Sequence, residues 1–162
     1  MHEEIWNALE NAIVLAVRSH QGQRDKAGEP YILHLFRVMN SVGDPVAKQA
    51  AVLHDFMEDV EGTVGELHRQ RISPAAIEAI MLLTHAPEIS YCSYIIALSR
   101  DTIACQVKQA DLEDNYRIGR VAYRAGHERE DAKRMQRYAL SHQFLSGGID
   151  EKEYRNRMRG LE

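Results

Sequence analysis

AAVLHDFMEDV, residues 50–60, is the stretch from which the rest of the chain is best interpreted. Its apolar residues are typical of a buried helix, yet His54, Asp55, Glu58 and Asp59 interrupt them. At about 100° per residue these four side chains fall within an arc of roughly 140° on one helical face. The carboxylates of Asp55, Glu58 and Asp59 would repel one another at such short separations, and a cation among them would offset this repulsion. A solvated acidic face with an incidental histidine is the alternative, but the apolar flanks favour a site for a divalent metal.

Two other segments offer further ligands for such an ion. His34 lies in PYILHLF, residues 30–36, an otherwise apolar predicted helix. Asp111 and Asn115 are one helical turn apart, so they can aim a carboxylate and an amide at one point. Taken alone, each has a plainer interpretation: His34 as a hydrogen-bonded core histidine, and the Asp111 segment as the charged face of a surface helix.

Helical periodicity extends over nearly the whole chain, and no segment alternates as a strand would. Helix starts are predicted near Glu29-Pro30, at Asp44-Pro45, in the Thr63–Glu66 capping box and at Ser73-Pro74. Later helices are predicted over about 91–99, 101–119, 128–145 and 150–159. Asp101 and Asp150 are the predicted N-caps of two of these later helices. We therefore predict a single all-α domain over residues 1–162, a bundle of about seven to nine helices.

Composition narrows the classes of partner. Of 162 residues, 20 are Lys or Arg and 24 are Asp or Glu, so the formal charge of −4 argues against a nucleic-acid polymer as the main partner. No apolar run is long enough to span a bilayer, and the acidic N-terminus does not resemble a signal peptide. Cys92 and Cys105 form no metal-type pair and no disulfide framework. We expect a cytoplasmic protein that does not bind membranes; assembly into a homo-oligomer is left open.

Four segments, in order, resemble the HD superfamily of metal-dependent phosphohydrolases. They are residues 20–34, HQGQRDKAGEPYILH; residues 54–59, HDFMED; residues 83–85, LTH, followed by the tyrosine of Tyr94-Ile95; and residues 107–115, VKQADLEDN. The resemblance covers about residues 8–120, leaves C-terminal helices over 121–162, and is strongest to the hydrolase domain of Rel/Spo-type guanosine polyphosphate enzymes and their small single-domain relatives.

The resemblance implies a role for each matching residue. The residues that match the family's metal ligands are His34, His54, Asp55 and Asp111. In this branch of the family the metal is usually manganese, so the resemblance implies Mn²⁺ or another divalent transition metal. Glu58 and Asp59 match the catalytic acidic pair that handles the attacking water. The residues that match substrate contacts are Arg24, Lys26 and Asn115. Three departures stand out: Asp25 separates Arg24 from Lys26, and Leu112 and Asp114 replace the Arg and His that two-domain enzymes tend to have.

The implied activity is the removal of pyrophosphate from the 3′ position of a guanosine polyphosphate, a small-molecule nucleotide, by metal-activated water. The chemistry is consistent with the residues, because a bound divalent ion lowers the pKa of its water and polarises a phosphoryl oxygen. Two alternatives stay open. The same chemistry could act on a different nucleotide or a phosphomonoester, or the chain could be a non-catalytic module that binds a nucleotide and signals to a partner.

Overall fold

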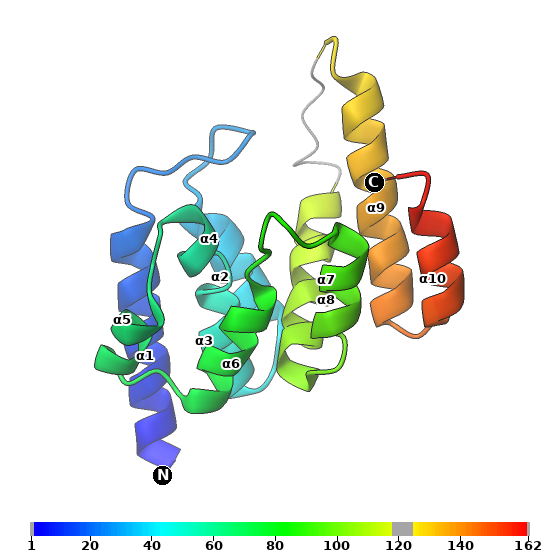
Figure 1. The fold of residues 1–162 in the computed structure, drawn as a ribbon. Coiled ribbons are helices and arrows are strands. Elements are labelled where there is room, and N and C mark those ends of the chain that lie inside the picture. Colours follow the sequence, from blue (N-terminus) through cyan, green and yellow to red (C-terminus); the bar gives the residue numbers. More distant parts are fainter. Residues whose placement is uncertain (1, 118–124, 162) are drawn as a thin grey trace.

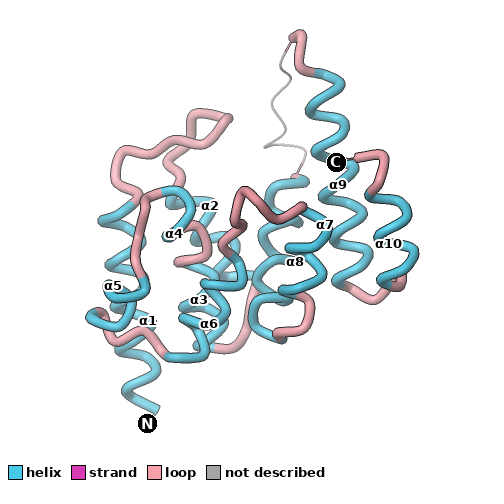
Figure 2. Tube along the Cα trace, viewed as in Figure 1, coloured by secondary structure: helices cyan, strands magenta, loops and turns pink. Residues whose placement is uncertain are grey.

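A computed structural model describes residues 2–117 and 125–161, and these residues form helices joined by loops (Figures 1 and 2). The ten helices among them are α1 (His2–Ser19), α2 (Ile32–Ser41), α3 (Pro45–Val52), α4 (Phe56–Asp59), α5 (Val64–Arg69), α6 (Pro74–Leu83), α7 (Tyr91–Leu98), α8 (Thr102–Tyr116), α9 (Glu128–Leu145) and α10 (Glu151–Met158). The described part of the chain contains no strand, only an isolated bridge between Arg24 and Pro30. The predicted all-α fold is confirmed, and the single-turn α4 adds to the expected number of helices.

The predicted helix starts depend on local capping, and several are confirmed. Asp44 accepts hydrogen bonds from two backbone N–H groups at the start of α3, and Thr63 and Glu66 form the predicted capping box of α5. Asp101 and Asp150 cap α8 and α10 in the same way. Residues 118–119, at the end of the predicted 101–119 helix, and residues 121–124 and 162 of the predicted C-terminal region lie outside the described residues.

Helix α2 begins two residues later than predicted, because the preceding chain forms its own loop. Asp25 N donates to Glu29 O, and Tyr31 N donates to Gln23 O, each across the loop. Gly22 and Gly28 both have φ near +84°, a left-handed conformation that disfavours other residues. Asp25 Oδ1 also accepts hydrogen bonds from the backbone of Ala27 and Glu29. Glu29 and Pro30, where the helix is predicted to begin, therefore belong to the loop, and α2 begins at Ile32.

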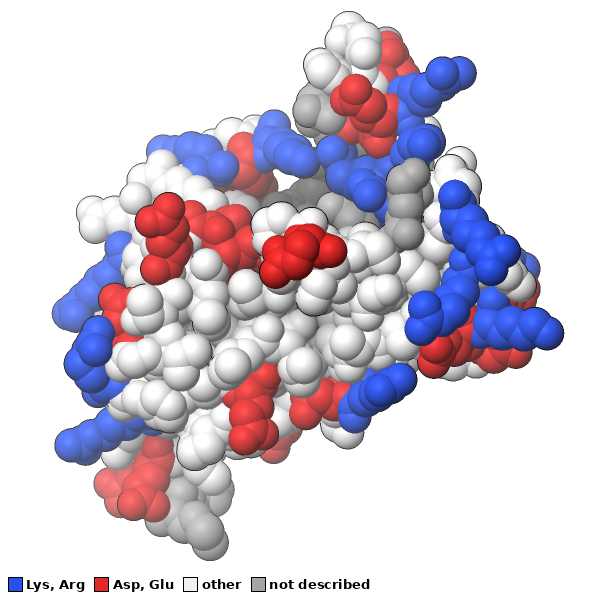
Figure 3. Space-filling view, viewed as in Figure 1, with Lys and Arg blue, Asp and Glu red and all other residues white. Residues whose placement is uncertain are grey.

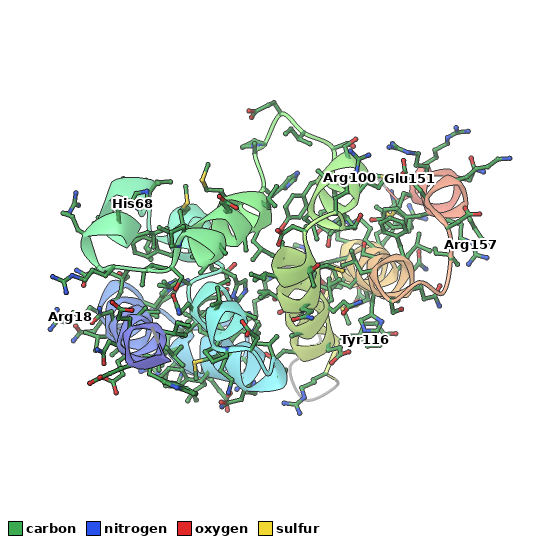
Figure 4. The ribbon with its side chains drawn as sticks, turned by 90° about the horizontal axis from the view of Figure 1, so that it is seen from below. Arg18, His68, Arg100, Tyr116, Glu151 and Arg157 are labelled. Atoms are coloured by element: carbon green, nitrogen blue, oxygen red, sulfur yellow. The ribbon has the colours of Figure 1, made fainter. Side chains whose placement is uncertain are left out.

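Helix α3 lies in the middle of the bundle and contacts α1, α2, α6 and α8. Ala47, Ala50 and Ala51 are fully buried, and their small side chains let neighbouring helices approach closely. Viewed from below, α8 lies between two groups of helices: α1, α2, α3 and α6 on one side, and α9 and α10 on the other. Tyr116 and Arg157 point outward (Figure 4). Because α8 contacts both groups, one of its faces is directed toward α2 and α3 and another toward α9.

The prediction that residues 50–60 form one continuous helix is wrong. Helix α3 ends at Val52, and α4 begins only at Phe56, so His54 and Asp55 lie in the turn between them. Leu53 (φ −114°, ψ 10°) and Asp55 (φ −97°, ψ 2°) leave helical geometry. The break lets the Phe56 ring enter the core, where a Cβ at position 62 would lie 2.2 Å from it, so only glycine fits there.

None of the helices in the described ranges is both long and apolar enough to cross a membrane.

Candidate active site

Three buried side chains from separate elements meet at one point. His34 lies in the first turn of α2, His54 in the turn after α3, and Asp111 in the middle of α8. Asp111 Oδ1 lies 3.3 Å from His34 Nε2 and 3.6 Å from His54 Nε2, and all three atoms lie within 4.8 Å of one another. The three groups could therefore share one metal ion.

Asp55, the fourth predicted ligand, lies at the edge of this cluster. Its Oδ2 is 3.0 Å from His54 Nε2 and 3.9 Å from His34 Nε2. Tyr31 donates its hydroxyl to the same oxygen at 2.6 Å. Burial, followed by the charge of Asp55, raises the pKa of Tyr31, so this hydroxyl keeps its proton and remains a donor. The four predicted ligands, scattered over 78 positions of the sequence, thus lie close together.

Hydrogen bonds on the far side of His54 direct its ring. The Nδ1–H of His54 donates to the carbonyl oxygen of Ala51 at 2.8 Å, since a carbonyl can only accept. In the neutral ring Nε2 then carries the lone pair. Among the described residues this buried nitrogen has no hydrogen bond of acceptable geometry, although Asp55 Oδ2 is near. When this nitrogen is deprotonated, its buried lone pair faces two carboxylates, which is the arrangement that a metal ion would satisfy, and imidazole with carboxylate suits a divalent transition metal.

The cluster attracts positive charge. Burial lowers the pKa of His54, but Asp55 and Asp111 outweigh it and hold the pKa well above its usual value. Burial raises the pKa of Asp111, yet Lys108 and the two histidines keep it well below the usual range. The pKa of Asp55 falls to about 2, because His54 outweighs the effect of burial. Both carboxylates are therefore ionised at neutral pH, which is the state that ligates a cation.

Asp111 is held on both oxygens by its own helix. Lys108 Nζ donates to Oδ2 at 2.8 Å, and Asn115 Nδ2 donates to Oδ1 at 2.6 Å. The predicted proximity of Asp111 and Asn115 is confirmed. In this structure the Asn115 amide contacts the carboxylate and also lines the adjoining cavity.

The acidic pair of α4 lies at the side of the same cavity. Asp59 Oδ2 accepts a hydrogen bond from Gln23 Nε2 at 2.8 Å, and Glu58 Oε2 accepts one from the backbone N–H of His85 at 3.3 Å. Gln23 uses its amide oxygen to accept from His20 Nδ1 at 2.6 Å. Both carboxylates are exposed, in contrast to the buried His34, His54 and Asp111 of the candidate metal-ligand cluster, so they are accessible to water in the cavity.

The cavity has a volume of about 450 Å³ and joins the metal-ligand cluster to a basic rim. Arg24 and Lys26, the predicted substrate contacts, belong to the loop before α2 and line this cavity. Lys and Arg side chains gather along the upper edge of the molecule, over this loop and over α9 (Figure 3). The remaining lining residues are Asp25, Ala27, Tyr31, Asp55, Glu58, Asp59, Leu83, Lys108, Asp111, Asn115, Arg134, Met135 and Tyr138.

Three lining residues, Arg134, Met135 and Tyr138, come from α9, a helix with no sequence motif that indicates a site. The stretch from Arg129 to Arg137 mixes charges of both signs, a pattern typical of a solvated helix face. Arg134 is instead only 22% exposed, and its Nη2 lies 2.8 Å from Asp131 Oδ1. No local pattern distinguishes it from its neighbours, because its place at the cavity depends on how α9 packs against α8.

No protein-family model matches the chain. It is 28% identical over 149 residues to a GTP pyrophosphokinase of Streptomyces coelicolor, covering 84% of this chain and 18% of that protein. It is 30% identical over 125 residues to a guanosine-3′,5′-bis(diphosphate) 3′-pyrophosphohydrolase of Aquifex aeolicus, covering 70% of this chain and 17% of that protein. The chain therefore spans less than a fifth of the length of these relatives.

A solved structure, described as a metazoan ortholog of SpoT that hydrolyzes ppGpp, superposes with a TM-score of 0.68 at 20% identity. The match covers 96% of this chain and 97% of that one, so the two share their all-α fold from end to end. This chain is a relative of the Rel/Spo-type hydrolase domain, as the four sequence segments indicated.

Proposed function

We propose that this chain is a metal-dependent phosphohydrolase that removes pyrophosphate from the 3′ position of a guanosine polyphosphate. The observation that carries the proposal is the convergence of His34, His54, Asp55 and Asp111 at the floor of a cavity with a basic rim. The Aquifex aeolicus relative is named for this activity, which supports the choice of substrate.

The four converging residues would hold a divalent metal ion, and Mn²⁺ is the ion we propose. When bound, such an ion makes a hydroxide-like nucleophile available at neutral pH and polarises a phosphoryl oxygen. The protein's part is to keep the ligands in place: Ala51 O orients His54, while Lys108 and Asn115 hold Asp111. Tyr31 does the same for Asp55.

Glu58 and Asp59 are the proposed bases for the attacking water. They lie on the cavity wall beside the metal ligands, where they can orient a water molecule and accept its proton. The amide of Gln23 fixes one oxygen of Asp59 and leaves the other oxygen available for this task. The His85 backbone holds Glu58 similarly.

The rim supplies the positive charge that a polyphosphorylated nucleotide needs. An anionic substrate that enters a pocket with several carboxylates is repelled unless cations offset them. Arg24 and Lys26 face the cavity from one side and Arg134 from another. Asp25, which separates the first two in the sequence, accepts two backbone hydrogen bonds of its loop with Oδ1, so one of its oxygens is directed into the loop.

The test is incubation of the purified chain with guanosine tetraphosphate and Mn²⁺, with release of pyrophosphate as the readout. We expect turnover in the wild type and none above background in the Asp55→Ala variant. Removal of the metal with a chelator should also lower the melting temperature, because an ion bound only to the native state stabilises it. Equal release by the wild type and Asp55→Ala would contradict the proposal.

A different phosphorylated nucleoside is the second candidate substrate. It is favoured by the departures at Asp25, which lines the cavity, and at Leu112 and Asp114, which are near the lining residue Asp111 in the sequence of α8. A panel of guanosine and adenosine polyphosphates, 5′-monophosphates and dinucleotides under one metal condition separates the two candidates. A non-catalytic nucleotide-binding module is less well supported, because both Glu58 and Asp59 are in place; nucleotide binding without hydrolysis would favour it.

A further inference from the structure

Helix α8 contacts the His34 ring at both of its nitrogens. Asp111 Oδ1 lies 3.3 Å from Nε2, and Asp114 Oδ2, three residues later, lies 2.7 Å from Nδ1. Asp114 is 5% exposed and His34 is 2% exposed, so this second contact is shielded from water. The His34 imidazole therefore lies between two carboxylates of α8: Asp111 faces Nε2 on the side of the metal-ligand cluster, and Asp114 contacts Nδ1 on the opposite side of the ring.

The contact behind the ring determines which nitrogen of His34 carries the proton. A carboxylate can only accept, so Nδ1 donates to Asp114 and Nε2 presents its lone pair to the cluster. His54 obtains the same orientation from a neutral carbonyl oxygen, that of Ala51. The two histidines therefore differ in the group that supports them: a carboxylate behind His34 and a backbone carbonyl behind His54.

Arg37 holds the other oxygen of Asp114. It lies one turn after His34 in α2, and its Nε donates to Asp114 Oδ1 at 2.7 Å. Arg117 Nη1 lies 3.5 Å from the same oxygen. The arginine compensates the charge of a carboxylate that is otherwise removed from water, and it fixes the rotation of the carboxylate. His34, Asp114 and Arg37 thus form one hydrogen-bonded chain that links α2 to α8.

We infer that Asp114 is a positioning residue for the metal site: it locks His34 as an Nε2 ligand and strengthens metal binding, with Arg37 holding the carboxylate in place. The inference rests on the metal site of the proposed function and adds Asp114 to the residues that support it. Outer partners that fix a ligating histidine typically contribute about 10- to 100-fold to metal affinity.

The first experiment measures Mn²⁺ affinity by calorimetry for the wild type and Asp114→Asn. The amide keeps the volume but replaces one carboxylate oxygen with an NH2 group, so it cannot accept from His34 and Arg37 on separate oxygens as the carboxylate does. We expect the dissociation constant to rise about 10- to 100-fold. Arg37→Gln should produce a smaller rise, because Asp114 still contacts His34.

Glu113→Gln provides the matched control. Glu113 is the neighbour of Asp114 in α8 and forms a pair of the same kind, with His142 Nε2 2.9 Å from its Oε1, but on the exposed surface away from the metal-ligand cluster. Its loss should leave Mn²⁺ affinity unchanged. Affinity of Asp114→Asn within twofold of the wild type would overturn the inference while leaving the metal site standing. Absence of Mn²⁺ binding by the wild type would overturn the proposed function and the inference together.

A second measurement does not depend on a variant at position 114 remaining folded. Long-range nitrogen–proton correlation spectra of the wild type loaded with diamagnetic Zn²⁺ report which imidazole nitrogen carries the proton. The His34 signals are assigned from their loss in His34→Gln. We expect the proton on Nδ1 of His34, and a spectrum with the proton on Nε2 would overturn the inference.

Discussion

The two ends of the cavity are built in different ways. At the metal-ligand end, His34, His54 and Asp111 are almost fully buried, and each is held by a second hydrogen bond from behind. At the rim, Arg24 and Lys26 are exposed, and Arg24 makes a long 3.4 Å contact to Gly28 O within its own loop. Bond-making chemistry needs ligands fixed within a fraction of an ångström, whereas attraction of a polyanion tolerates mobile side chains.

The largest effect is expected at the buried end. Asp55→Ala removes a metal ligand and should reduce turnover by about 10³-fold or more, since a metal ion contributes several kcal/mol to catalysis of this kind. Pyrophosphate release at saturating substrate measures the loss, and circular dichroism checks that the helices remain. Retention of a tenth or more of the activity would show that the cluster is not where the chemistry occurs.

The acidic pair should separate catalysis from metal binding. Asp59→Asn and Glu58→Gln keep shape but remove a base, so each should lower turnover by about 100-fold, within the range of general-base catalysis. Mn²⁺ affinity measured by calorimetry should stay within a few-fold of the wild type. A parallel loss of metal affinity would place these carboxylates among the ligands.

Substitutions at the rim should have a weaker effect than those at the buried end, and the effect should be on KM and not on turnover. Arg24→Ala and Arg134→Ala each remove a cation that lines the cavity. A charge-assisted hydrogen bond is worth about 1.5–3 kcal/mol, so KM should rise about 10- to 100-fold with turnover largely kept. Arg155→Ala is the control, because Arg155 pairs with Glu151 on α10 and does not line the cavity. A fall in turnover with unchanged KM would assign the rim a role in the chemistry.

The smallest effect is expected where the two ends are connected. Gln23 belongs to the rim loop, yet its amide orients Asp59. Gln23→Ala removes one hydrogen bond worth about 0.5–1.5 kcal/mol, so turnover should fall several-fold and metal affinity should not change. Steady-state kinetics beside calorimetry checks both. Unchanged kinetics would mean that Asp59 does not depend on this contact.

Local sequence predicted much of the fold because capping is local. The side chains of Asp44, Thr63, Asp101 and Asp150 each bond to backbone groups two or three residues away, and these bonds mark real helix starts. The break at residues 53–55 could not be found in this way. Nothing in that segment disfavours a helix, and the contact that accompanies the turn, between the Phe56 ring and Gly62, forms only in the folded core.

The candidate site was predicted as residues but not as a network. The types of ligand residue and their spacing along the chain are visible in the sequence, and the folded structure places these residues next to one another. Tyr31, Asp114 and Arg134 were missed, because each acts across the bundle on a partner that sequence distance does not reveal. Asp114 and His34, for example, are 80 positions apart.

The order of the helices, their caps and the kinds of metal-ligating side chain are set by the sequence itself, because periodicity and capping depend on neighbours within a turn or two. Which nitrogen of His34 faces the metal-ligand cluster, and which arginine of α9 reaches the cavity, is decided only when α2, α8 and α9 pack. Those contacts join residues far apart in the chain, and burial in the folded core is what makes each hydrogen bond directional and costly to lose.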